Sequence, residues 1–212
     1  MAQEFADFIR TRKKANLAVA TVNIAVFIVL CILGDPGSAS FMAQHGGAYT
    51  PLILEGEYYR LFTAMFLHFS FMHLANNMIC MLFIGDMVET AAGPWRYLVI
   101  CLGGGLIGNL CSLWWDLRTG TCAVSAGASG CVFALIGAAL LMIIRSHRSE
   151  ERDSLLRRFG LLAVLSVAQG FMETGTDNAA HIGGLAGGFV LAALLSAAAS
   201  FGGKSKKRRR EI

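Results

Sequence analysis

The chain has 212 residues, of which 55% are hydrophobic and 15% are charged, with a formal net charge of +4. Soluble globular domains carry about 25% charged residues, so this composition argues against a soluble protein. The apolar residues are gathered into largely uncharged blocks, namely residues 17–33, 67–88, 95–115, 129–144, 159–172 and 179–201. A helix needs about 20 residues to cross about 30 Å of hydrocarbon. We therefore expect an all-α polytopic membrane protein, whose six transmembrane helices form a core of residues 17–201 between a tail of residues 1–16 and a basic tail of residues 202–212.

The first block, residues 17–33, has two possible interpretations. Lys13 and Lys14 precede it and Ser-Ala-Ser follows at residues 38–40, as in a cleaved signal peptide. Its seventeen uncharged residues exceed the length of about 7–15 that is usual for the apolar region of a signal peptide, so we expect a retained helix. The segment that follows, residues 34–60, is long for a connection and partly apolar. We expect it to lie against the membrane surface.

The second block carries polar side chains that a membrane span does not need. His73 and Asn77 are four residues apart and so share one helical face, and we expect His68 at the outer end of the same helix. Polar groups inside a membrane are costly and mark candidate functional sites. The alternative is that they hydrogen-bond neighbouring helices, which we favour for His68. Two donors on one face make His73 and Asn77 candidates for stabilising an oxyanion.

The third block contains the run Gly103, Gly104 and Gly105, which favours close helix packing over a nucleotide-binding loop. Six cysteines lie within or beside the blocks, at positions 31, 80, 101, 111, 122 and 131. They show neither metal-ligand spacing nor the disulfide pattern of a small secreted domain. We interpret them as small core residues.

The fourth block begins at Ser129, where the small residues Gly127, Ala128 and Gly130 surround a hydroxyl at the start of an apolar helix. The simpler explanation is that Ser caps the helix and Gly permits the turn. However, the sixteen residue steps from Arg145 up to Ser129 rise only about 24 Å at ~1.5 Å per residue, so Ser129 should stop below the outer surface. Irregular backbone at that depth is tolerated only inside protein or beside a water-filled cavity. We expect a wet pocket with Ser129 at its floor.

The sixth block opens with His181 beside small residues at every fourth position, which are Ala180, Gly184 and Gly188. The fourth block has a matching stripe of Gly130, Ala134 and Ala138. Small residues at this spacing let two helices approach closely. If the stripes face each other, Ser129 and His181 lie near the outer ends of touching helices, and a hydroxyl meets the base that can activate it.

Basic residues fall mainly on one side of the expected bundle. Sixteen of the 18 Lys and Arg residues lie in the N-terminal tail, at Arg96, between Arg145 and Arg158, or from Lys204 onward, while Arg60 and Arg118 fall on the other side. The positive-inside rule therefore predicts that both termini are cytoplasmic. Beside a final helix, the basic tail indicates topology and contact with anionic lipid, and we predict no nucleic-acid partner.

Other hydrolytic chemistries fit the sequence less well. A nucleophile elbow needs Gly-x-Ser-x-Gly, but Cys131 stands where the last Gly belongs. A zinc protease needs His-Glu-x-x-His, and neither His68 nor His73 is followed by Glu. Asp86 is the only Asp well inside a block, which argues against a paired-aspartate membrane protease. A transporter is also disfavoured, because no inverted repeat is seen.

Taken in order along the chain, these motifs resemble those of the rhomboid intramembrane serine proteases. Gly127 to Gly130 is similar to the family's Gly-x-Ser-Gly motif, which implies that Ser129 is the nucleophile. The run from Ala180 through Gly184 to Gly188 resembles its Ala-His-x-x-Gly motif, which implies that His181 is the base. The resemblance to a His-x4-His-x3-Asn motif, carried by His68, His73 and Asn77, implies that the last two residues complete an oxyanion hole with the Ser129 amide.

Two further stretches resemble structural elements of the same family. Residues 85–93 are similar to its Gly-x-x-x-Glu-x-x-x-Gly element, with Glu89 in a structural role. Arg60 follows Tyr59 where the family has a Trp-Arg pair, so Tyr59 is a departure. Phe133 is a second departure from the family pattern, since bacterial members often have at this position a Tyr that packs on the catalytic His. Phe keeps the ring and loses the hydroxyl.

The resemblance implies a Ser-His dyad that cleaves transmembrane segments of membrane proteins near the outer membrane face. It implies a multi-pass protein of a bacterial inner membrane that needs no metal or other cofactor. The rival is a rhomboid-like protein that binds membrane clients without cutting them. Such proteins typically lack the Ser or the His, whereas Ser129 and His181 are both present here. The substrate and the oligomeric state do not follow from the sequence.

Overall fold

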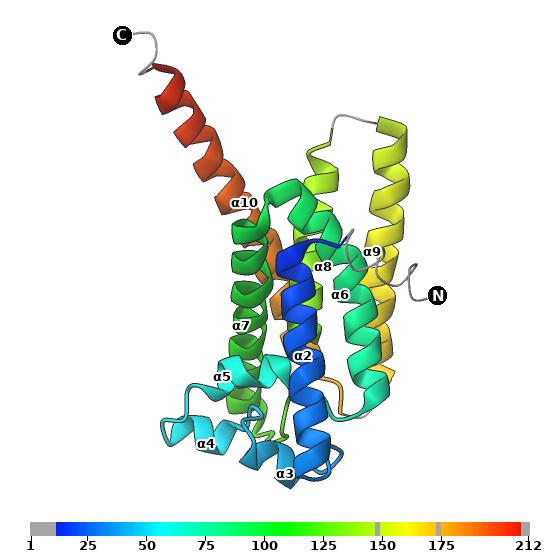
Figure 1. Cartoon of the computed structure of the whole chain (residues 1–212), viewed down its shortest axis with the longest axis vertical. Helices are drawn as coiled ribbons and strands as arrows, with labels where there is room; N and C mark the ends of the chain where they lie inside the picture. The colour runs from blue at the N-terminus through cyan, green and yellow to red at the C-terminus, as the bar shows by residue number, and fades with distance from the viewer. Residues whose placement is uncertain (1–11, 147–148, 173–174, 209–212) are drawn as a thin grey trace.

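The computed structural model describes residues 12–146, 149–172 and 175–208. Within these residues the chain is built from helices, which are, in order, α2 (Lys14–Leu33), α3 (Ala39–Gln44), α4 (Thr50–Leu54), α5 (Arg60–Thr63), the 3-10 helix η1 (Ala64–Phe66), α6 (Phe71–Ala92), α7 (Pro94–Thr119), α8 (Ser129–Ile144), α9 (Ser149–Met172) and α10 (Asn178–Arg208). The long helices run side by side, and α3, α4 and α5 lie together at one end of the bundle (Figure 1). We call this the α3–α5 end.

Four helical segments are long and apolar enough to cross a membrane, namely Lys14–Leu33, Phe71–Ala92, Pro94–Thr119 and Asn178–Ala198. Helix α8 is apolar but has only 16 residues, and α9 begins with a charged stretch and is not among the four. The prediction of an all-α, multi-pass membrane protein is therefore confirmed. The count of six spans stays a prediction.

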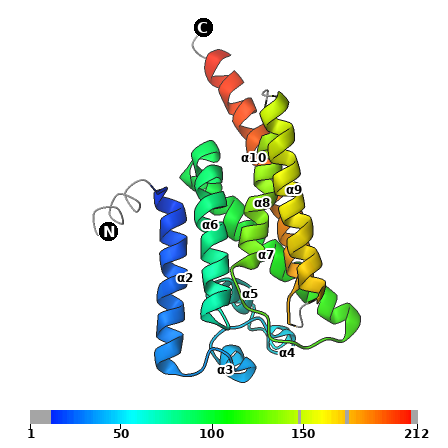
Figure 2. The ribbon, with the colours of Figure 1, turned by 90° about the vertical axis from the view of Figure 1, so that its right-hand side faces the viewer.

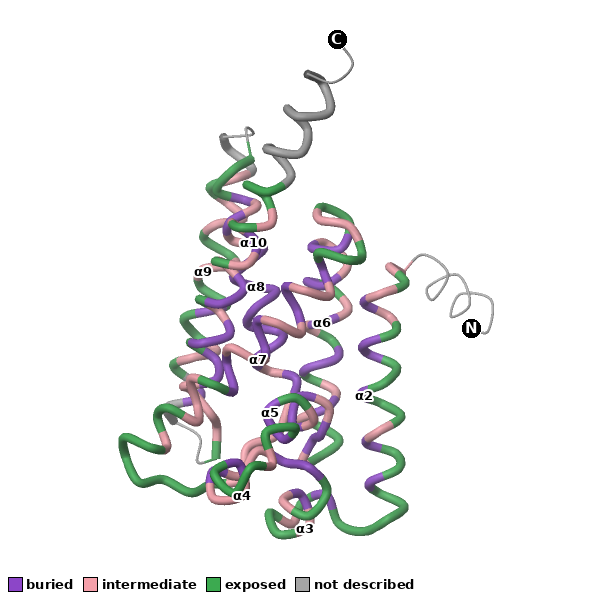
Figure 3. The backbone as a smooth tube through the Cα atoms, turned by 90° about the vertical axis from the view of Figure 1, so that its left-hand side faces the viewer, coloured by how far each residue is buried: buried purple, intermediate pink, exposed green. Residues whose placement is uncertain are grey.

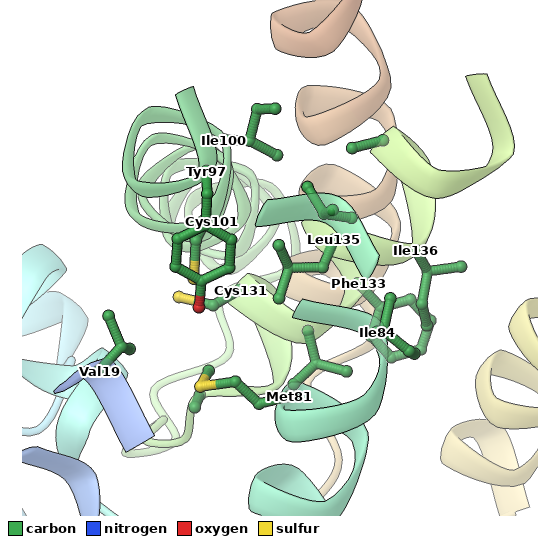
Figure 4. Close-up of a cluster of buried hydrophobic side chains, with 14 of the residues drawn as sticks. Val19, Met81, Ile84, Tyr97, Ile100, Cys101, Cys131, Phe133, Leu135 and Ile136 are labelled. Carbon is green, nitrogen blue, oxygen red and sulfur yellow. The ribbon is translucent and has the colours of Figure 1, made fainter. Parts of the chain in front are cut away.

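Helix α8 is the centre of the bundle. Helices α6, α7, α9 and α10 pack against it, and Figure 2 shows α2 and α9 at opposite edges. Buried residues follow α8 along its length, while the outer faces of α2 are exposed (Figure 3). A helix that is apolar on all sides needs such a central position. Side chains from α2, α6, α7 and α8 meet in one cluster, among them Val19, Met81, Tyr97, Cys101, Cys131 and Phe133 (Figure 4).

Helices α8 and α10 approach each other along the small residues that the sequence singled out. A Cβ atom added to Gly184 would overlap the carbonyl oxygen of Gly130, and one added to Gly188 would overlap that of Ala134. Backbone is thus packed against backbone, which a larger residue would prevent. The prediction that the two stripes face each other is confirmed.

A polar cluster at the opposite end of the bundle holds α2 against α6. Glu89 of α6 accepts hydrogen bonds from the backbone N–H groups of Asn16 (2.8 Å) and Ala15 (3.3 Å). These are amides of the first turn of α2, which otherwise lack partners. Asp86 binds the Asn16 Nδ2 (2.8 Å) and the Arg12 guanidinium (3.0 Å). We infer that the structural role expected of Glu89 is to cap α2.

Two expectations, about His68 and about the cysteines, need correction. His68 does not lie on the second span, because Ser70 is in extended conformation, accepts a hydrogen bond from the His73 N–H (3.1 Å) and starts α6 only at Phe71. Helix α10 continues to Arg208 and so takes in part of the basic tail of residues 202–212, which stays a prediction as a cytoplasmic tail. Cys31 and Cys122 are exposed and are not core residues, whereas Cys101 and Cys131 are buried.

Candidate active site

Ser129 is the first residue of α8, and the irregular segment before it is held inside the protein. Ser125 pairs with Ala48 through two backbone hydrogen bonds (2.8 and 2.9 Å). The Gly127 N–H donates to the carbonyl oxygen of Ala64 (2.9 Å), and the Ala128 N–H donates to Nε2 of His68 (3.4 Å). The irregular segment is therefore held by protein partners, and the wet pocket with Ser129 at its floor stays a prediction.

His68, which accepts this hydrogen bond from the segment before α8, is fully buried. Because its Nε2 accepts from Ala128, the ring is neutral with its proton on Nδ1, a tautomer assigned from that hydrogen bond. Its ring meets that of His73 edge to face, with centroids 5.0 Å apart. His68 thus lies between the segment before α8 and helix α6.

Helix α6 brings His73 and Asn77 to the same region. A Cβ atom at Gly127 would lie 2.8 Å from Nε2 of His73, and the φ of Gly127 is +144°, so two separate features require glycine there. Asn77 is buried, and its Nδ2 donates to the carbonyl oxygen of His73 (3.0 Å). An amide nitrogen carries two N–H groups, so one remains for another acceptor.

His181 lies in the first turn of α10 with its ring stacked on that of Phe133. The ring centroids are 4.4 Å apart and the planes differ by 16°. Phe133 is one helical turn after Ser129 on α8, so the imidazole lies over the face of α8 that carries the hydroxyl. His181 is buried. Among the protein atoms described, its Nδ1 has no hydrogen-bond partner.

Arg60 and Glu89 lie apart from this group and contact other segments. Arg60 is buried and donates to the carbonyl oxygens of Gly47 (3.0 Å) and Ala43. It also donates to the Glu57 carboxylate (2.7 Å), which accepts from the Tyr59 hydroxyl as well. These hydrogen bonds, from Tyr59 and then Arg60, hold the pKa of the Glu57 carboxyl below its ordinary value. Tyr59, the departure from Trp, is therefore part of the Arg60 network.

Sequence reasoning missed a polar group at the α3–α5 end. Asp177, directly before α10, accepts hydrogen bonds from Ser125 (2.7 Å) and from Ser112 of α7. An Asp just before an apolar helix is a helix-start signal, and that signal was present in the sequence. Its partners come from distant segments and were not predictable. Within the described residues, no group of three or more His, Cys, Asp or Glu side chains could hold a metal ion.

Helices long enough to cross a membrane, together with polar groups buried between them, define a multi-pass membrane protein. A sequence model of the Rhomboid domain matches residues 55–198, which is more than half of the chain. The chain therefore belongs to the rhomboid family. His73 and Asn77 in α6, Ser129 in α8 and His181 in α10 all lie within the matched residues.

Several relatives support this assignment. The chain is 33% identical over 174 residues to Rhomboid protease GluP of Bacillus subtilis (strain 168), a match that covers 82% of this chain and 33% of that protein. It is 37% identical over 145 residues to RHOMBOID-like protein 5 of Arabidopsis thaliana, covering 68% and 46%. It is 28% identical over 204 residues to Rhomboid protease AarA of Providencia stuartii, covering 86% and 71%. The chain thus spans less than half the length of the first two relatives.

Proposed function

We propose that this chain is an intramembrane serine endopeptidase that cleaves transmembrane segments of membrane proteins near the outer membrane face. Membership of the rhomboid family and similarity to relatives named as proteases support the reaction class. The observation that carries the residue assignment is the stack of His181 on Phe133 at 4.4 Å, one helical turn from Ser129. Ser129 is the proposed nucleophile and His181 the proposed base.

In the proposed reaction, Nε2 of His181 takes the proton from Oγ of Ser129 as Oγ attacks the scissile carbonyl carbon. The tetrahedral intermediate then loses the amine, which receives that proton from His181, and an acyl ester remains on Ser129. Water activated by His181 hydrolyses the ester and restores the hydroxyl. Every proton moves between His181 and the reacting atoms, so a Ser-His dyad is sufficient.

The negative charge of the intermediate needs donors that are already in position. We propose the Ser129 N–H at the start of α8, Nε2 of His73 and the second N–H of Asn77. The first is at a helix N-terminus, which favours an anion. His73 is adjacent to Gly127, and Asn77 lies one turn further along the same face of α6. Losing one such donor typically costs about 10²–10³ in rate.

The test is cleavage of a model transmembrane substrate by the purified protein in liposomes. We expect Ser129→Ala and His181→Ala to abolish cleavage while helical content and melting temperature stay close to wild type. Ser40→Ala, which changes an exposed hydroxyl of α3, is the matched control and should cleave normally.

A fluorophosphonate probe separates the proposal from its rival. Labelling of the wild type, lost in Ser129→Ala, supports an activated serine. Cleavage by Ser129→Ala at the wild-type rate would overturn the proposal. A wild type that neither cleaves nor reacts with the probe, but retains client membrane proteins, would favour the non-cleaving alternative.

A further inference from the structure

Asp177 joins three separate parts of the chain at the α3–α5 end. Its Oδ1 accepts a hydrogen bond from the Ala180 N–H (2.9 Å), which caps α10, and its carbonyl oxygen accepts the His181 N–H (3.1 Å). Its Oδ2 accepts from the hydroxyl of Ser125 (2.7 Å) in the segment before α8, and from that of Ser112 in α7. One carboxylate therefore fixes the first turn of α10 to two neighbours.

The position of that turn decides where the imidazole of His181 lies. In Ser-His-Asp enzymes a carboxylate orients the imidazole through Nδ1, but here Nδ1 of His181 has no partner among the protein atoms described. The ring is held by its stack on Phe133 and by its own backbone. That backbone is the one that Asp177 caps.

Asp177 also reaches the segment that carries the nucleophile. Ser125 is four residues before Ser129, and its backbone is paired with Ala48. The bond from Ser125 to Asp177 therefore links the start of α8 to the start of α10 at the end where Ser129 and His181 lie.

We propose that Asp177 is a positioning residue for Ser129 and His181, which acts by fixing the first turn of α10 to the segment before α8. The inference rests on the proposed function. A carboxylate suits this role because it only accepts hydrogen bonds and is favoured at a helix N-terminus. It accepts from two hydroxyls and one amide, whereas an Asn would have to turn its NH₂ group toward some of these donors.

The test compares Asp177→Ala and Asp177→Asn in the full chain, with kcat expressed per fluorophosphonate-reactive site. We expect Asp177→Ala to lower kcat about 10–100-fold, since a misplacement of about 1 Å can cost 10²-fold. KM for the model substrate should stay within about twofold, because loss of an interaction that acts only in the transition state lowers kcat alone. Asp177→Asn, which keeps the acceptor for Ala180, should retain more activity than Asp177→Ala.

Coupling between Asp177 and Ser125 is the second readout. Ser125→Ala should lower kcat in the same direction, and the double variant Asp177→Asn/Ser125→Ala should be no worse than the more affected single variant, because both changes break one link. Asp116→Ala is the matched control. Asp116 is a half-buried carboxylate at the same end whose side-chain hydrogen bond, within the described residues, is to Thr50 (2.6 Å). It should keep the wild-type kcat.

The possible outcomes distinguish this inference from the proposed function. Suppose that the wild type cleaves and Ser129→Ala does not, but Asp177→Ala keeps the wild-type kcat per reactive site and only melts at a lower temperature. Asp177 is then merely structural, so the inference is wrong while the proposed function stands. Cleavage by Ser129→Ala overturns both. If Asp177→Ala fails to fold, Asp177→Asn decides. The inference about Asp177 would be wrong if Asp177→Asn had the wild-type kcat and Ser125→Ala lowered kcat equally in the wild-type and Asp177→Asn backgrounds.

Discussion

His181 is held in a way that suits a two-residue catalytic pair. Its ring lies flat on Phe133, and no carboxylate contacts Nδ1 within the described residues. A stacked ring fixes the plane of the imidazole but leaves rotation within that plane free, so other contacts must set its direction. The hydroxyl that a Tyr would add at position 133 is not needed for the stack itself, since the Phe133 ring already lies 4.4 Å from the imidazole, centroid to centroid.

Replacing Asn77 tests whether its amide stabilises the transition state. Asn77→Ala should lower kcat by roughly 10–10³-fold, the upper end being the cost of one side-chain donor, with little change in KM. The backbone amide of Ser129 and His73 remain, so some activity should survive. Measuring kcat and melting temperature on one preparation checks this.

The alternative for Asn77 is a purely structural role within α6. Its Nδ2 donates to the carbonyl oxygen of His73 in the same helix, and a typical hydrogen bond contributes about 0.5–1.5 kcal/mol to stability. Under that alternative the variant melts earlier but keeps its kcat. Such a result would remove Asn77 from the proposed oxyanion hole.

At the scale of elements, much of the site could be predicted from the sequence. The spacing of small residues predicted that α8 and α10 touch, and the position of Arg145 predicted that α8 is short. Local patterns suffice for these features, because they depend on residue size and helix length alone. The start of α6 was missed because Ser70 sets it through an N-cap, and a cap competes with a continuous apolar run. The partners of Asp177 were missed because they lie 52 and 65 residues away along the chain.

The close contact between α8 and α10 predicts that two glycines differ in how well they tolerate replacement by Ala. Gly188→Ala should lower the stability by about 1–3 kcal/mol, the usual cost of overpacking, because its Cβ would overlap the carbonyl oxygen of Ala134. Gly160→Ala in α9 is the matched control, since nothing lies within 4 Å of the added Cβ atom. It should be neutral or slightly stabilising, as Ala has the higher helix propensity. Thermal unfolding in detergent measures both, and equal melting temperatures would contradict the close contact.

The whole molecule is held together by different means at its two ends. At one end, Glu89 and Asp86 bind the first turn of α2. At the α3–α5 end, Arg60 and the Ala48–Ser125 bridge hold the segment between α2 and α6, and Asp177 joins α7, the segment before α8 and the start of α10. The second group lies where Ser129 and His181 lie, so the site is assembled from segments that are far apart in the sequence.

The distribution of basic residues predicts that the α3–α5 end faces outward and that both termini are cytoplasmic. Cys122, between α7 and α8, is exposed and belongs to the outer side on this prediction. A membrane-impermeant maleimide should therefore label it in intact cells, and Cys122→Ser should remove the label. Cys31 is also exposed but lies within α2, a helix long and apolar enough to cross the membrane, where surrounding lipid keeps a water-soluble, membrane-impermeant reagent away. In the Cys122→Ser background, Ser146→Cys, on the loop after α8, should react only after the membrane is permeabilised. If that variant were labelled equally in sealed and in permeabilised cells, the predicted orientation would be wrong. The proposed face at which substrates are cut would then be wrong as well.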